Sequence, residues 1–185
     1  MKILTFIADG TEDSELITTL DLLKRGGIDY HIISCSKKNT ELSHKINIIA
    51  DDVIDNHSLQ SLMDYDGLFF PGGKRGTDTV KSNKLVLDLI SQYELRKKPI
   101  MAICAAPTIL GKAGIMNGVN FTCYDGFEND VVGGIYHKGA SVIRDKNIIT
   151  GRSAGYTIEF ALEIIEYLKG KDERDSVSKK LLLEV

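Results

Sequence analysis

The chain has 185 residues, of which 43% are hydrophobic and 26% are charged, values typical of one globular domain. Its formal net charge is −3, and its lysines and arginines are spread among acidic residues, so we expect no nucleic-acid partner. No apolar run approaches the ~20 residues needed to span a membrane, and the N-terminal segment lacks the pattern of an export signal. These features predict a cytoplasmic protein with no membrane partner.

The three cysteines, Cys35, Cys104 and Cys123, are an odd number. In a chain without an export signal they are expected to be reduced thiols. There is no Cys-x-x-Cys pair, and the four histidines do not have the spacing of zinc ligands. We therefore expect no metal and no cofactor.

Hydrophobic patterns predict strands that alternate with helices along the first part of the chain. Residues 2–8 are nearly all apolar and predict a strand buried on both faces. Residues 14–27 predict a helix with Leu16, Leu20 and Leu23 on one face and a Gly-Gly stop. The next predicted elements are a strand at 28–36, one or two short strands within 43–55, a strand at 64–73 that ends in a proline–glycine turn, a helix at 82–98, a strand at 99–104 and a short helix at 105–114.

The last part of the chain predicts short strands and then a long helix. The short strands fall within 120–130 and 131–151, and the helix covers 156–170, with Ile158, Ala161, Leu162 and Ile165 along one face. Residues 171–185 are expected to be a terminal helix or a frayed tail. The alternation of strands and helices predicts a single domain over 1–170, with a mostly parallel sheet between two layers of helices.

In sheets of this class, ligands bind beyond the carboxyl ends of the strands. Three loops leave predicted strands at that edge: 8–15, 71–76 and 104–107. The functional region is therefore expected where these loops meet.

Cys104 lies where a predicted strand passes into a predicted helix, among small residues such as Ala102, Ala105 and Ala106. This pattern is typical of a nucleophile elbow, in which a tight turn holds the nucleophile above the strand. A helix N-terminus would lower the pKa of the thiol below its usual ~8.5. The pattern is equally compatible with a buried structural cysteine.

Gly72 and Gly73 follow another strand and permit a close backbone approach or a positive φ. The N–H groups of Gly73 and Ala105 are candidates to face an oxyanion, although a plain turn is the alternative. Glu15 lies at the start of the apolar face of the first helix and is expected to point inward. Burial would raise its pKa, and a protonated Glu15 would donate a hydrogen bond to a thiolate, whereas an ionised one would disfavour it.

The stretches ADGTEDSEL, FFPGG, AICAAP, TCYDGFE and GRSAGYTIEFAL occur in this order over about residues 1–170. Together they resemble the ThiJ/PfpI superfamily, and within it the branch of the Parkinson-disease protein and its bacterial relatives. The resemblance implies a flavodoxin-like, class I glutamine amidotransferase-like sandwich that forms a homodimer.

The resemblance also implies roles for particular residues. It implies that Cys104 is the reactive elbow cysteine, that Glu15 contacts its thiol, and that Gly72, Gly73 and Ala105 line an oxyanion pocket. Arg152 matches an arginine near that pocket, and Asp21, Arg25 and Lys45 match positions near the dimer interface. Tyr124 is expected at the pocket, where it would position a substrate hydroxyl or simply cap the pocket.

Two departures from the family pattern affect the expected chemistry. Family members that act as proteases have a histidine directly after the cysteine, where this chain has Ala105, so no peptidase activity is expected. Another branch has a histidine where this chain has Tyr124, so no general-base histidine is assigned. His57 and His137 are expected on the surface or in loops, Cys35 in the core, and Cys123 in a packing role or as a second thiol.

Three functions follow from the resemblance. The favoured one is a cysteine-dependent enzyme for small reactive carbonyls, of the cofactor-independent glyoxalase or deglycase type, acting through a Cys104 hemithioacetal. The second is an oxidative-stress sensor or chaperone that works through oxidation of Cys104. The third, a role in thiazole phosphate metabolism, has only Lys74 and Arg75 as possible anion contacts, and these are expected to be solvated turn charges.

Overall fold

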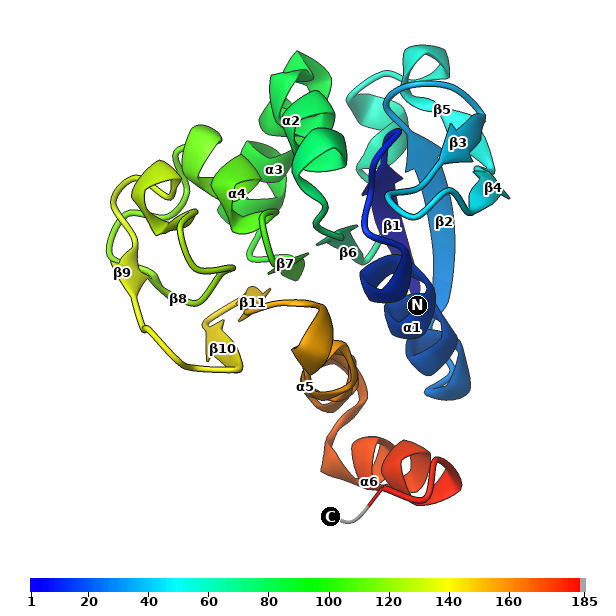
Figure 1. Ribbon diagram of the computed structural model, residues 1–185, viewed down its shortest axis with the longest axis vertical. Helices are drawn as coiled ribbons and strands as arrows, with labels where there is room; N and C mark the ends of the chain where they lie inside the picture. The colour runs from blue at the N-terminus through cyan, green and yellow to red at the C-terminus, as the bar shows by residue number, and fades with distance from the viewer. Residues whose placement is uncertain (184–185) are drawn as a thin grey trace.

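The computed structural model describes residues 1–183 and places one sheet between two layers of helices (Figure 1). The strand order is β10-β11-β7-β6-β1-β2-β5. All neighbours in this sheet are parallel except β10 and β11 at one edge. The strands are β1 (Lys2–Ile7), β2 (Asp29–Ser34), β5 (Asp52–Val53), β6 (Gly67–Phe70), β7 (Ile100–Ile103), β10 (Val142–Asp145) and β11 (Ile148–Gly151). The flavodoxin-like three-layer α/β fold is confirmed.

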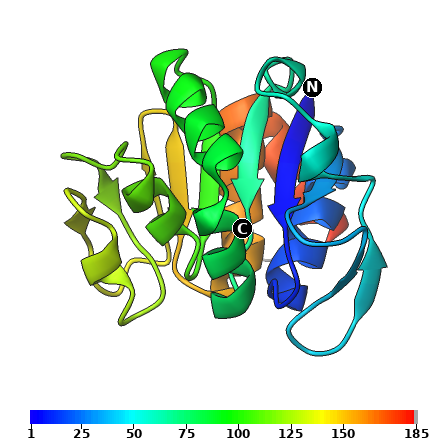
Figure 2. The ribbon, with the colours of Figure 1, turned by 90° about the horizontal axis from the view of Figure 1, so that it is seen from above.

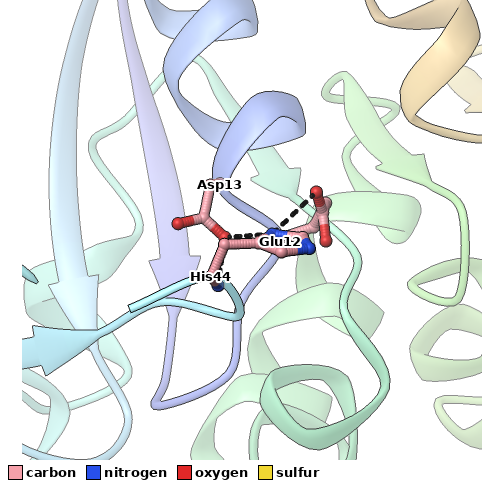
Figure 3. Close-up of side chains that lie close together, drawn as sticks. All are labelled: Glu12, Asp13 and His44. Carbon is pink, nitrogen blue, oxygen red and sulfur yellow. Dashed lines mark hydrogen bonds and ion pairs between the residues drawn. The ribbon is translucent and has the colours of Figure 1, made fainter. Parts of the chain in front are cut away.

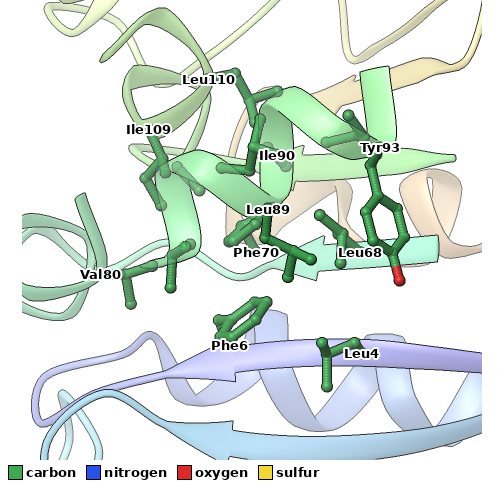
Figure 4. Packing of buried hydrophobic residues seen from close by; sticks show 14 of the residues in the cluster. Leu4, Phe6, Leu68, Phe70, Val80, Leu89, Ile90, Tyr93, Ile109 and Leu110 are labelled. Atoms are coloured by element: carbon green, nitrogen blue, oxygen red, sulfur yellow. The ribbon is translucent and has the colours of Figure 1, made fainter. Parts of the chain in front are cut away.

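Each face of the sheet is covered by its own hydrophobic core, because side chains alternate along a strand. On one face, Leu4, Phe6 and Phe70 pack under α2 (Lys74–Ser82), α3 (Lys84–Leu95) and α4 (Pro107–Lys112) (Figure 4). On the other face, Ile3, Phe69 and their neighbours pack under α1 (Asp13–Arg25) and α5 (Thr157–Lys169). Figure 2 shows the two helix layers on opposite sides of the strands. This two-sided burial explains why the central strands are almost entirely apolar.

The helices agree with the predicted segments apart from one addition. They are α1 (Asp13–Arg25), α2 (Lys74–Ser82), α3 (Lys84–Leu95), α4 (Pro107–Lys112), α5 (Thr157–Lys169) and α6 (Lys171–Lys180). α1 buries Leu16, Leu20 and Leu23 and ends at Gly26, as predicted. The C-terminal segment forms α6, which packs on α5 through the fully buried Val177; Glu184 and Val185 lie outside the described residues.

The buried face of α5 differs from the predicted one. Phe160, Ala161, Ile164 and Ile165 are buried, whereas Ile158 is 42% exposed. Ile158 and Leu162 instead line a groove that α6 closes on its other side with Ser178. The predicted stripe therefore mixed residues that face the sheet with residues that face this groove.

Several elements were not predicted. The sequence predicts a loop at 71–76 and no element at 77–81, where α2 forms; its sequence, KRGTDTVKS, contains one large apolar residue, Val80. Lys74 and Arg75 lie in its first turn, where Lys74 pairs with Asp78 and Arg75 with Asp9. The other unpredicted elements are short: β3 (Asn39–Glu41) and 3₁₀ helices at Ile54–Asn56, Gln60–Leu62, Glu128–Asp130 and Ala154–Tyr156. The short strands predicted within 43–55, 120–130 and 131–151 include β4 (Asn47–Ile49), which pairs with β3, and β8 (Asn120–Phe121), which pairs with β9 (Ile135–Tyr136).

Among residues 1–183, we find no helix with both the length and the apolar composition needed to cross a bilayer.

Candidate active site

Three loops meet at the carboxyl edge of the sheet, as the sequence predicted. β1, β6 and β7 are neighbours and parallel, and Phe70 is paired with Ala102 in the register of β6 and β7. The segments that follow these strands therefore leave the sheet side by side. They carry Cys104, the Gly72–Gly73 pair and the loop that leads to Glu15.

Cys104 has the backbone of an elbow. Its φ is +64°, a left-handed conformation that costs energy for a residue with a side chain. Its N–H donates to Gly151 O at 2.9 Å, and its carbonyl accepts from Tyr124 N–H at 2.9 Å. Ala105 and Ala106 behind it are fully buried. Bonds to two other segments thus hold the thiol in a strained and fixed position.

Glu15 points inward from α1 and is completely buried. Its Oε2 accepts the Gly72 N–H at 2.8 Å, and its carboxyl interacts with the Cys104 thiol. Its Oε1 has no other hydrogen-bonding partner among the described residues. The predicted inward orientation of Glu15 is confirmed.

The two glycines are required by the close approach of these groups. A Cβ on Gly72 would lie 2.6 Å from Cys104 Cβ and 2.6 Å from Glu15 Oε2. Gly73 has a φ of +85°, and a Cβ there would overlap the Gly10 carbonyl oxygen. Because Gly72 and Gly73 have no side chain, the N–H groups of Gly73 and Ala105 can face the Cys104 sulfur. These are the two donors that the sequence proposed for an anion.

Glu15 and Cys104 form a coupled pair of acids. Burial raises the pKa of Glu15 from 4.5 to about 7, and the hydrogen bonds from Cys104 and Gly72 oppose this. Burial also raises the pKa of the Cys104 thiol, as does the negative charge of an ionised Glu15, while the Gly73 and Ala105 N–H groups lower it. Two anions cannot share this buried site, so the pair loses one proton near neutral pH and the second only at a much higher pH.

The expected lowering of the thiol pKa by a helix N-terminus is therefore wrong. α4 is six residues long and begins only at Pro107, so it supplies little field at the sulfur. Once the pair has lost one proton, the remaining proton can be on Glu15 or on Cys104. The thiolate is favoured only when this proton is on Glu15, since the carboxyl then donates a hydrogen bond to the sulfur instead of repelling its charge.

Tyr124 and Arg152 lie in a pocket of about 500 Å³ next to the Cys104 backbone. Tyr124 is 50% exposed, and Arg152 forms an ion pair with Asp125. The sequence did not identify Asp125. The TCYDGFE stretch shows an acid there, but nothing in the sequence pairs it with an arginine 27 residues later.

The other predicted thiols and histidines have contacts of their own. Cys35 and Cys123 belong to or pack against the core, and burial raises the pKa of each thiol to about 12. This favours the expected packing roles. His57 pairs with Asp52, and His137 contacts Asn120 Oδ1 at 2.7 Å; neither contact involves the Cys104 site.

Glu12, Asp13 and His44 form the one group among residues 1–183 whose ligand-type atoms lie within 4.8 Å of one another (Figure 3). His44 Nδ1 lies 3.0 Å from Asp13 Oδ2 and 3.7 Å from Glu12 Oε1. The hydrogen bond to Asp13 and the charge of Glu12 raise the pKa of His44. These contacts, together with the bond from His44 N–H to Asp13 Oδ2, fasten the turn before β4 to the start of α1.

Comparison with known proteins places this site in a family. Dj-1beta of Drosophila melanogaster is 33% identical over 182 residues, covering 97% of this chain and 96% of that protein. Its crystal structure matches with a TM-score of 0.89 and covers 100% of this chain and 98% of the other. The Parkinson disease protein 7 homolog of Danio rerio is 31% identical over 186 residues, covering 99% and 97%.

A third relative is Deglycase PH1704 of Pyrococcus horikoshii, 28% identical over 170 residues, which covers 91% of this chain and all of that protein. The sequence pattern described as DJ-1/PfpI family matches residues 1–167, which include every residue of the site above. The chain therefore belongs to the DJ-1/PfpI family, as its resemblance to the ThiJ/PfpI superfamily indicated.

Proposed function

We propose that this protein is a cysteine-dependent enzyme that converts small α-oxoaldehydes into 2-hydroxy acids without a cofactor. The observation that carries the proposal is the buried Glu15 carboxyl against the thiol of Cys104, which is held at a positive φ under two N–H donors. A relative named as a deglycase also supports chemistry on carbonyl compounds.

In the first step the Cys104 thiolate attacks the aldehyde carbon and forms a C–S bond, and the carbonyl oxygen takes up a proton to give a hemithioacetal. The N–H groups of Gly73 and Ala105 stabilise the negative charge on that oxygen before it is protonated. Attack therefore requires the proton of the pair to be on Glu15.

In the second step Glu15, now a carboxylate, removes the proton from the former aldehyde carbon and returns it to the adjacent carbonyl carbon through an enediol. The first carbon is oxidised and the second reduced, so no external oxidant is needed. The product is a thioester, and water hydrolyses it, which breaks the C–S bond and releases the hydroxy acid and the free thiol.

The test is lactate formation from methylglyoxal with glutathione absent. We expect turnover by the wild type and none above buffer by Cys104→Ala, because no other thiol contacts Glu15. Cys123→Ala is the matched control and should stay active, since that buried thiol only donates to Tyr124 O. Failure of the wild type to form lactate would contradict the proposal and favour the redox-sensor alternative.

We also propose that the protein is a homodimer. Three isoleucines are largely exposed, Ile17 on α1 and Ile46 and Ile49 beside or on β4. The turn before β4 is joined to the start of α1, because His44 N–H donates to Asp13 Oδ2. Asp21, Arg25 and Lys45, which the resemblance placed near an interface, are in ion pairs within the chain.

Sedimentation should give twice the mass of the chain, and Ile46→Asp should raise the dimer dissociation constant at least tenfold, because it places a charge in an apolar contact. Ile135→Asp, at a site that is also 50% exposed but lies on β9, should leave the mass unchanged. A monomeric wild type would refute the dimer.

A further inference from the structure

Asp125 and Arg152 form a closed ion pair beside the reactive cysteine. Arg152 Nη2 donates to both carboxylate oxygens of Asp125, at 3.1 and 2.9 Å, and Nε donates at 3.2 Å. Tyr136 OH donates to the same carboxylate at 3.1 Å, and the guanidinium lies 6.0 Å from the centre of the Tyr156 ring. Both partners are thus oriented from more than one side.

The main chain places this pair next to Cys104. Gly151, which accepts the Cys104 N–H, directly precedes Arg152, and Tyr124, which donates to the Cys104 carbonyl, directly precedes Asp125. The two charged residues also line one pocket of about 500 Å³ with Tyr124, Ser153 and Tyr156. Because the pocket adjoins the Cys104 main chain, a substrate held at the thiol would meet the pair if its substituent extended into this pocket.

We infer that the Asp125–Arg152 pair sets the substrate class: it excludes carbonyl compounds that carry a carboxylate and accepts uncharged ones that carry hydroxyl or keto groups. The inference rests on the proposed function insofar as it speaks of a substrate. The selectivity itself concerns access to Cys104, so it applies to any reagent that reacts with the thiol.

The physical reason is that an unpaired arginine in this pocket would attract carboxylates, since its planar donors match two carboxylate oxygens. Here Asp125 already takes that position. An incoming carboxylate must displace Asp125 or lie beside it, and like charges brought together lower the affinity. An uncharged hydroxyl instead can donate to Asp125 and accept from Arg152 without separating them.

Two alkylating reagents of nearly equal size isolate this effect. Iodoacetamide and iodoacetate both react when the thiolate displaces iodide, forming a C–S bond and breaking the C–I bond, and they differ in carrying an amide or a carboxylate. The quantity to measure is the ratio of the rate constants of Cys104 with iodoacetate and with iodoacetamide, at one pH, with the labelled site identified by mass spectrometry.

Asp125→Asn should raise this ratio about fivefold or more, and Arg152→Gln should lower it by a similar factor, because each leaves one charge uncompensated near the thiol. Both shifts should shrink in 1 M salt, where charges are screened within about 3 Å. Asp130→Asn is the matched control, since it removes an exposed acid from the same segment, and it should change the ratio less than twofold.

The inference would be overturned if the ratio in Asp125→Asn stayed within twofold of the wild-type ratio. It would also be overturned if Asp130→Asn shifted the ratio as much as Asp125→Asn does, because the shift would then reflect only the net charge of the protein. The outcome does not depend on turnover. A chain that forms no lactate but shows the opposite shifts in the two variants loses the proposed function and keeps the selective pocket.

Discussion

Glu15→Gln should make the protein more stable than the wild type as the pH rises from 5 to 8, by about 2 to 3 kcal/mol in the free energy of unfolding. Burial raises the pKa of Glu15 from 4.5 to about 7, so the folded state holds this proton more tightly than the unfolded state does. The stability that the protonated carboxyl contributes is complete below pH 4.5 and is lost as the pH rises to about 7. Glutamine does not ionise and avoids this loss.

The same variant should lose turnover by a factor of 10² or more, because an amide cannot carry a proton between two carbons. It should nevertheless still be alkylated at Cys104, and the inflection near pH 7 in the alkylation rate of the wild type should disappear. Asp172→Asn is the control for stability, since Asp172 also lies in the first turn of a helix but is exposed. A stability difference that does not vary between pH 5 and pH 8 would show that Glu15 is not buried as an acid.

If Glu15→Gln is both more stable and inactive, the buried ionisable carboxyl of Glu15 lowers the stability of the fold in exchange for activity. The positive φ of Cys104 and the ionisable buried carboxyl of Glu15 are two unfavourable features that lie together at the site where they assist chemistry. No described lysine or arginine forms an ion pair with Glu15, so this cost is not offset by a salt bridge.

Much of this site can be predicted from sequence because it depends on patterns within short segments. An apolar strand followed by Cys104 and small residues indicates an elbow, and an acid at the start of an apolar helix face indicates that Glu15 turns inward. Parallel strands then bring the two together, since their carboxyl ends lie at one edge. The position of each group follows from the fold class and needs no long-range contact to be known.

What could not be predicted depends on partners distant in sequence. The pKa of the thiol is decided by burial and by the state of Glu15, and neither is visible at Cys104. Asp125 and Arg152 come from different loops, and β3 has three residues, too few for a clear alternation. α2 has a glycine at Gly76, whose surroundings leave no space for a Cβ beside Thr11, so tertiary packing decides that segment.

Gly72→Ala should damage both the site and the fold. The new Cβ would lie 2.6 Å from Cys104 Cβ and from Glu15 Oε2, and 3.0 Å from Ile103 O. All three atoms belong to groups fixed by the backbone or by burial, so none can move away without breaking another contact. We expect about 1 to 3 kcal/mol of destabilisation, as for other overpacked sites, and a loss of turnover greater than a hundredfold.

The loss of turnover should exceed what the destabilisation explains, because the methyl group separates the two members of the acid pair. Alkylation of Cys104 in Gly72→Ala should therefore lack the inflection near pH 7, as in Glu15→Gln, while Gly155→Ala, where a Cβ has only Ser153 Oγ within 4 Å, should behave as the wild type does. If Gly72→Ala kept both the inflection and the turnover, the pocket would have more space than this geometry allows. The contact between the thiol and the carboxyl could then not be the cause of the pH dependence of Cys104 reactivity.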